Sequence, residues 1–145
     1  VVGGWKLLFF ERGAFRPDPT KSEEWNRGAY LVNGPGHCAE CHSNRNALGA
    51  IIPATRFAGG PDPEGRGFVP NITQTPEALG KWSKGEIAEL LKTGFTPNFD
   101  SVGGTMAAVV RNTAQLPEAD RQAMAEYLKS LPAVQGPPRP VKTGG

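Results

Sequence analysis

The feature that most constrains this chain is the run Cys38-Ala39-Glu40-Cys41-His42, which contains both of its cysteines. Two residues between the thiols let one tight turn present both sulfurs along one edge of a haem, where they can add to its two vinyl groups. His42 follows at once, so its imidazole is placed over the face of the same ring as a ligand to iron. The run therefore predicts one covalent haem c, attached through Cys38 and Cys41 and ligated by His42.

Two other kinds of site use the same cysteine spacing. A thioredoxin-like redox pair is expected between a strand and a helix, and a zinc site needs a second pair of ligands elsewhere. The sequence offers neither pattern. The other histidine, His37, directly precedes Cys38 and cannot reach the opposite face of a ring held by that turn. Haem attachment is therefore the favoured interpretation.

A second axial ligand has to come from a distant segment, and the chain has two methionines. Met106 follows Gly103-Gly104-Thr105 in an expected loop, where glycines allow the backbone to approach a haem closely. Met124 lies on the apolar face of an expected helix and is assigned to the core. We expect Met106 to ligate iron, which favours electron transfer because a saturated iron has no place for a substrate. The alternative is that Met106 only packs nearby and leaves the iron open.

Composition indicates one loop-rich domain. Among 145 residues there are 19 glycines and 14 prolines, and only 38% are hydrophobic, so a bound apolar cofactor would supply part of the core. A net charge of +2 without a basic run makes nucleic acid an unfavoured partner. The pattern divides into an apolar extension and linker at 1–20, a haem domain at 21–134 and a Pro-rich tail at 135–145.

Three amphipathic helices are expected in the haem domain. The first is capped by Ser22 and ends near Asn33, the second follows the capping box Ser83-Lys84-Gly85-Glu86 and stops at Gly94, and the third spans 117–131. Residues 43–76 show no helical period, residues 96–106 are expected as loop, and residues 107–112 as a short helical turn.

The first ten residues are apolar but too short to cross a bilayer, which needs about 20 residues, so no transmembrane span is expected. Trp5 and Phe9 are interpreted as covering the core of this domain. The alternative is that this segment docks onto a preceding domain.

Several segments together resemble class I cytochrome c: Arg27-Gly28-Ala29-Tyr30-Leu31-Val32, the Cys-x-x-Cys-His run, Met106, and Tyr127-Leu128. The resemblance implies an all-α fold, with three main helices and long loops around one covalent haem. It also implies that the first and last helices cross at Gly28. More narrowly, the segments at 5–9, 37, 43–46, 71–73 and 82–83 resemble a haem module of multi-haem subunits in periplasm-facing dehydrogenases for alcohols, aldehydes or sugar acids.

Further site residues follow from the same resemblance. In the wider family a proline carbonyl accepts a hydrogen bond from the proximal histidine, and Pro53 is the candidate, although it could be an ordinary turn residue. Haem propionates need N–H donors, for which the candidates are Arg45, Arg56, Asn71 and Trp82. Lys81, Lys84 and Lys92 could form a basic rim for an acidic partner, or simply the solvent face of a helix.

The expected function is single-electron transfer by a His/Met-ligated haem, from a periplasmic dehydrogenase to a respiratory acceptor such as an oxidase or another cytochrome. An upstream haem domain of the same polypeptide is a further candidate partner. The expected location is the periplasm, with membrane association through a partner or a missing segment as an option. The alternative is a haem enzyme or small-ligand sensor with an open or displaceable sixth position.

Overall fold

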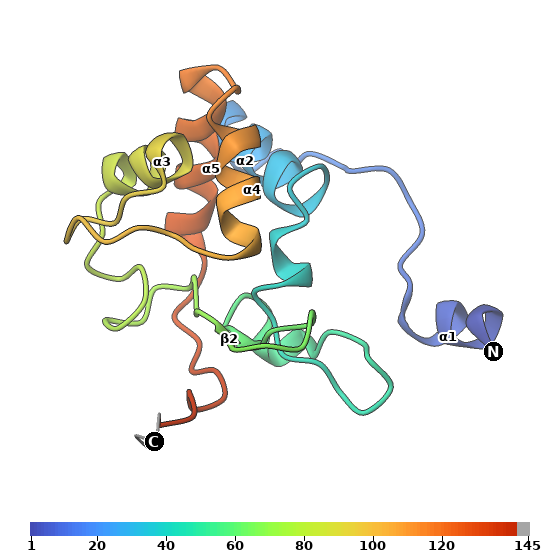
Figure 1. Cartoon of the computed structure of the whole chain (residues 1–145). Helices are drawn as coiled ribbons and strands as arrows, with labels where there is room; N and C mark the ends of the chain where they lie inside the picture. The colour runs from blue at the N-terminus through green and yellow to red at the C-terminus, as the bar shows by residue number, and fades with distance from the viewer. Residues whose placement is uncertain (142–145) are drawn as a thin grey trace.

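In a computed structural model that describes residues 1–141, the chain folds into five α-helices joined by long loops (Figure 1). The helices are α1 (Val2–Phe9), α2 (Glu23–Asn33), α3 (Lys84–Thr93), α4 (Thr105–Thr113) and α5 (Glu118–Ser130). The loops contain two short 3-10 helices, η1 (Cys38–Glu40) and η2 (Pro53–Thr55), and an antiparallel pair of strands, β1 (Gly60–Pro61) and β2 (Phe68–Val69). The predicted all-α class is confirmed, with α2, α3 and α5 as its three main helices.

Local capping groups set the start of α2 and both ends of α3, as the sequence predicts. The Ser22 side chain accepts a hydrogen bond from the Trp25 amide at the start of α2. At the start of α3, Ser83 and Glu86 form the reciprocal capping box. Gly94 ends α3 with a φ of 80°, a left-handed conformation that glycine adopts without steric cost.

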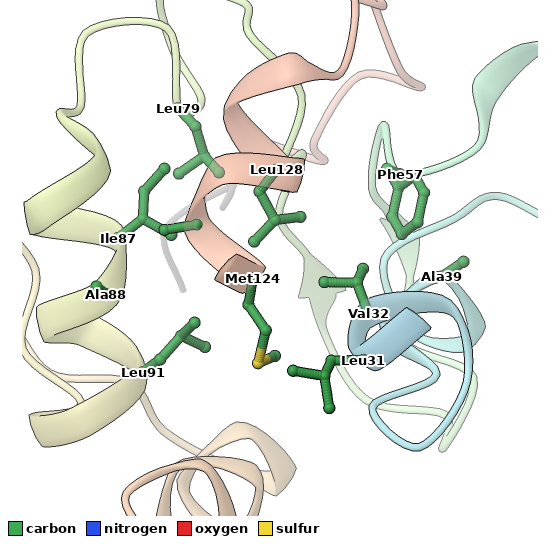
Figure 2. Close-up of a cluster of buried hydrophobic side chains, with 11 residues drawn as sticks. Leu31, Val32, Ala39, Phe57, Leu79, Ile87, Ala88, Leu91, Met124 and Leu128 are labelled. Atoms are coloured by element: carbon green, nitrogen blue, oxygen red, sulfur yellow. The ribbon is translucent and has the colours of Figure 1, made fainter. Parts of the chain in front are cut away.

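The core lies where α2 and α3 pack on α5. Figure 2 shows Met124 and Leu128 of α5 between Ile87 and Leu91 of α3 on one side and Leu31 of α2 on the other. Met124 is 2% exposed, so the prediction that it is a core residue is confirmed. The buried cluster consists of Leu31, Val32, Ala39, Phe57, Leu79, Ile87, Ala88, Leu91, Met124, Ala125 and Leu128.

The crossing of α2 and α5 depends on the absence of a side chain at Gly28. A Cβ atom at this position would lie 1.9 Å from the Ala123 carbonyl oxygen and 2.9 Å from the Tyr127 Cβ. The two backbones can therefore approach this closely only because residue 28 is glycine. The expected helix crossing at Gly28 is confirmed.

The segment that carries Met106 differs from the expected loop. Helix α4 begins at Thr105, directly after Gly104, and continues to Thr113. Gly104 has a φ of 56° and a ψ of −143°, a combination that breaks the extended chain before the helix, while Thr105-Met106-Ala107-Ala108 can all adopt helical geometry. Met106 therefore belongs to the first turn of a helix, and the predicted turn at 107–112 is the rest of that helix.

Helix α1 stands apart from the helical body at the end of an extended segment (Figure 1). None of its residues is buried, and the Trp5 and Phe9 rings pair with each other at 5.5 Å. The Trp5 indole N–H donates to the Leu48 carbonyl at 3.0 Å. The interpretation that Trp5 and Phe9 cover the core is therefore wrong, because neither belongs to the buried cluster. Within residues 1–141, no helix has the length and apolar character required to cross a bilayer.

The chain after α5 runs along the loop side of the molecule without regular structure up to residue 141. The backbone passes close to Ala58, since a Cβ at Gly136 would lie 1.9 Å from the Ala58 carbonyl oxygen. The predicted Pro-rich tail at 135–145 thus begins as a packed strap, and its last four residues lie outside the described part of the chain.

Candidate functional site: the Cys-x-x-Cys-His turn

The turn that presents the two cysteines is formed by local backbone hydrogen bonds. The Glu40 amide donates to the His37 carbonyl, and the His42 amide donates to the Cys38 carbonyl, both at 2.9 Å. The turn packs against the end of α2, where the Gly36 amide donates to the Leu31 carbonyl at 2.8 Å. Neither cysteine forms a disulfide, and both side chains are partly exposed, so both sulfurs are available for covalent attachment.

The pKa values of both thiols separate this site from a thioredoxin-like pair. Burial raises the pKa of Cys38 to about 11, and burial, with smaller contributions from nearby carboxylates, also raises the pKa of Cys41. Reactive redox pairs instead have a cysteine with a lowered pKa, because the thiolate is the nucleophile. Neither thiol therefore has the lowered pKa that is typical of the attacking cysteine of such a pair.

The His42 ring is held by a carbonyl that the sequence did not identify. Its Nδ1 lies 2.8 Å from the carbonyl oxygen of Pro70, 28 residues later. A carbonyl can only accept a hydrogen bond, so Nδ1 carries the proton and the lone pair of the neutral ring lies on Nε2. Burial lowers the pKa of His42, and its bond to Pro70 offsets that effect only in part. Within the described residues no protein group hydrogen-bonds Nε2, which leaves it free for a metal.

The assignment of Pro53 as this acceptor is wrong. Pro53 begins the 3-10 helix η2, and its carbonyl accepts from the Arg56 amide. Pro53 lines a cavity of about 310 Å³ together with Phe57, Tyr127 and Leu131. No residue of the cysteine turn lines this cavity. The reason for the error is loop length: the chain makes the β1–β2 hairpin before it returns to the histidine.

Gly59 allows that return. The His42 carbonyl accepts a hydrogen bond from the Gly59 amide at 2.9 Å, so the histidine is held through its backbone as well as its ring. Gly59 has a φ of 80°, and a Cβ there would lie 2.6 Å from the Val69 carbonyl oxygen and 2.8 Å from the Pro70 carbonyl carbon. Only glycine permits the two segments to pass at this distance beside His42.

The groups at this site are those that a covalently attached haem requires. It combines two unbridged thiols on one turn with a neutral, buried imidazole whose Nδ1–H is fixed by a backbone carbonyl. Such a carbonyl bond orients a ligating histidine and strengthens it as a donor to a metal.

Met106 is half-buried in the first turn of α4, in contrast to the fully buried Met124. Met106, Val110 and Thr113 follow the spacing i, i+4, i+7 and share one face of the helix. Val110 and Thr113 are 8% and 7% exposed, so this is the face that α4 turns towards the interior. Its role as an iron ligand stays a prediction.

The proposed propionate donors have other partners within the described chain. Arg45 donates to the Gly49 carbonyl and to the backbone and carboxylate of Glu40, which braces the cysteine turn. Asn71 donates to the Val134 carbonyl and accepts from Thr73, so it ties the strap after α5 to the loop. Trp82 packs against the hydrophobic core. Their contacts with haem propionates stay predictions.

One of the three lysines proposed for a basic rim, Lys84, is engaged in ion pairs. Lys84 binds Glu24 of α2 and Glu126 of α5, at 2.5 and 3.2 Å. These carboxylates come from other helices, which is why sequence spacing along α3 could not reveal them. Lys84 therefore links three helices rather than presenting a free charge.

A helical fold that brings a Cys-x-x-Cys turn and a fixed histidine together defines a haem-binding module. Residues 26–132 match the family model described as Cytochrome c, and the chain therefore belongs to the cytochrome c family. Covalent haem c and an electron-transfer role are the general properties of that family.

The chain is also similar to several characterised proteins. It is 53% identical over 140 residues to a diheme cytochrome c-type protein of Cereibacter sphaeroides, covering 93% of this chain and 44% of that protein. Against the fructose dehydrogenase cytochrome subunit of Gluconobacter japonicus, identity is 37%, covering 91% of this chain and 27% of that relative. Identity is also 37% to the cytochrome c subunit of alcohol dehydrogenase (quinone) from Gluconacetobacter polyoxogenes, covering 92% of this chain and 30% of that relative. The chain thus spans less than half the length of each of these relatives.

Proposed function

We propose that this module transfers single electrons through one haem c, attached by Cys38 and Cys41, with His42 and Met106 as the two axial ligands. The haem would supply the reversible change of iron between its ferrous and ferric forms. The protein would hold the imidazole of His42 in a fixed tautomer and orientation, and Met106 on the inward face of α4 would supply the second ligand.

The observation that carries the proposal is the hydrogen bond of 2.8 Å from His42 Nδ1 to the Pro70 carbonyl. Within the described residues, this bond leaves the Nε2 lone pair without a partner, in a ring that is 9% exposed and follows directly after the two thiols. This hydrogen bond fixes the orientation and the tautomer of the ring, so that the free lone pair on Nε2 is held ready to bind iron beside the two thiols.

The test is the optical spectrum of the purified holoprotein. Ferric haem with a bound thioether has a weak far-red band, and we expect this band in the wild type and its loss in Met106→Ala. Carbon monoxide should bind slowly or not at all to the reduced wild type and rapidly to the variant.

Met124→Leu is the matched control, because it changes the other thioether while conserving the volume of a buried side chain. We expect it to keep the far-red band. A wild type without the band that binds carbon monoxide rapidly would favour the alternative, a haem enzyme or small-ligand sensor.

We further propose that the module works in the periplasm as one haem domain of a longer polypeptide, between a dehydrogenase and a respiratory acceptor. The support is the similarity to a diheme cytochrome and to dehydrogenase subunits, together with the exposed apolar side chains of α1 that a neighbouring domain could cover. Rapid reduction of the haem by a dehydrogenase supplied with its alcohol or sugar substrate would support this role, and reduction no faster than without enzyme would contradict it.

A further inference from the structure

Arg121 of α5 is a buried cation with an unusual set of partners. The residue is 5% exposed, and its Nη1 donates to the carbonyls of Thr113, at 3.3 Å, of Ala114, at 3.1 Å, and of Leu116. Its Nη2 donates to the Glu118 carboxylate at 2.6 Å. The three carbonyls belong to the last residue of α4 and to the turn that follows it. One guanidinium thus fixes the C-terminal end of the helix that carries Met106.

A buried charge at this place has a cost in free energy. Within the described residues, Arg121 Nε is the one buried side-chain nitrogen or oxygen without a hydrogen-bond partner. An unpaired buried N–H is unfavourable, and an apolar side chain of similar size is often as stable as a buried cation. Arg121 differs from an apolar residue in that it holds the carbonyl of Thr113, the last residue of α4, and two carbonyls of the turn that follows in one orientation.

The two ends of α4 are held very differently. At the C-terminal end, the Thr113 hydroxyl also donates to the Leu91 carbonyl of α3, at 2.5 Å. The N-terminal end follows Gly103 and Gly104, which have no atom near their Cβ positions, and Gly104 provides no side-chain cap. The nearest backbone anchor before α4 is Val102, whose amide donates to the Gly94 carbonyl at 2.9 Å, and the two glycines that follow it form a flexible connection. The position of the first turn therefore depends strongly on how firmly the last turn is held.

Met106 lies two helical turns from this anchored end. Seven residues separate it from Thr113, which corresponds to about 10 Å along the axis, so a tilt of about 10° at the anchored end would move Met106 by about 2 Å. Metal–ligand distances are defined to within about 0.2 Å. A change at the anchor that is too small to unfold the helix would therefore be large enough to displace a ligand.

We propose that Arg121 is a positioning residue for Met106: by fixing the end of α4, it sets how firmly the thioether is held towards the iron. The proposal rests on the proposed ligation by Met106. Arg121 does not itself contact the haem site residues, since its partners are the carbonyls at the end of α4 and in the turn that follows it, together with Glu118. Loss of Arg121 should make the thioether easier to displace.

The experiment measures displacement of the thioether by imidazole in the ferric holoprotein, followed by loss of the far-red band. Arg121→Gln should lower the imidazole concentration for half displacement about tenfold, the effect of losing hydrogen bonds from a charged group. Arg121→Lys keeps the charge but not the forked geometry and should give an intermediate value. If Arg121→Gln yields no folded holoprotein, the imidazole concentration measured for Arg121→Lys tests the proposal instead.

Asp120→Asn is the matched control, because the neighbouring residue of α5 pairs with Arg27 of α2 and not with α4. It should weaken global stability and leave the imidazole concentration unchanged. The positioning role would be overturned if the Arg121 variants bound imidazole like the wild type. It would also be overturned if Asp120→Asn bound imidazole as tightly as Arg121→Gln. A wild type without the far-red band would overturn the ligation by Met106 and this proposal together.

Discussion

Gly28 sets the distance between α2 and α5 because it has no side chain. We expect Gly28→Ala to destabilise the protein by about 3 kcal/mol, since its Cβ would meet the Ala123 carbonyl oxygen at 1.9 Å and the helices would have to separate. The free energy of unfolding, measured by denaturant titration of the holoprotein, tests this.

Gly85→Ala provides the comparison. Gly85 lies in α3 with only the Ser83 hydroxyl near its Cβ position, at 3.8 Å, so alanine should fit there and stabilise the helix by about 0.5 kcal/mol. Equal losses of stability in both variants would show that loss of glycine in general, rather than contact between α2 and α5, is responsible.

At the residue scale, the sequence was informative wherever the chemistry is local. The cysteine spacing and the adjacent histidine are a contiguous motif, and Met124 could be assigned to the core from helical periodicity alone. Pro70 and Gly59 could not be identified because their roles depend on where a long loop returns. The ion pairs of Lys84 could not be predicted either, because its partners Glu24 and Glu126 belong to other helices.

At the scale of elements, the α2–α5 contact includes an ion pair that should depend on pH. Arg27 donates through two nitrogens to the Asp120 carboxylate, at 2.9 Å each, and this contact lowers the pKa of Asp120 below its ordinary value of 3.8. The folded state thus favours the ionised carboxylate. Its contribution is fully present above the unfolded-state pKa and is lost as the pH falls through the lower, folded-state pKa.

We expect Asp120→Asn to reduce the free energy of unfolding by about 0.5 kcal/mol at pH 6, a small value because half of the Arg27 side chain is exposed to solvent. The difference from the wild type should shrink as the pH falls below the ordinary value of 3.8, because the wild-type carboxyl then becomes protonated. Denaturant titrations across this range measure it, and Arg27→Gln should behave alike. A difference that grows on acidification would contradict the assignment.

Helices α2 and α3 could be predicted because Ser22, Ser83 and Gly94 mark their ends in the sequence, and α5 because its apolar residues recur at helical spacing between Pro117 and Pro132. Helix α4 was predicted too short, since two glycines before Met106 indicate a loop whether or not a helix follows them. The contacts of the segment that forms α1 could not be predicted, because an apolar sequence shows that a segment avoids water but does not show which surface covers it. The β1–β2 hairpin was missed because its paired strands are only two residues long.

For the whole molecule, the proposed haem should contribute a large part of the free energy of unfolding. Only 38% of the residues are hydrophobic, and the segment from 43 to 82 contains few regular elements. A tightly bound group stabilises the folded state by several kcal/mol. We expect the double variant Cys38→Ala/Cys41→Ala, purified without haem, to melt at least about 10 °C below the holoprotein.

Thermal unfolding followed by circular dichroism measures this loss. Met106→Ala should retain the attached group and show a much smaller decrease in Tm. A haem-free variant that melts at the temperature of the holoprotein would mean that the helices and the packed loops are stable by themselves.

The double attachment of His42 has a consequence for how such a module can diversify. Its carbonyl meets Gly59 and its ring meets Pro70, so both contacts belong to the loop that follows the cysteine turn. Apart from Phe57, no residue between 43 and 70 belongs to the buried cluster formed largely by α2, α3 and α5. Substitutions in this loop away from Phe57, and from Ile51, which packs against the cluster, can therefore change the setting of the histidine with little change to the helical scaffold.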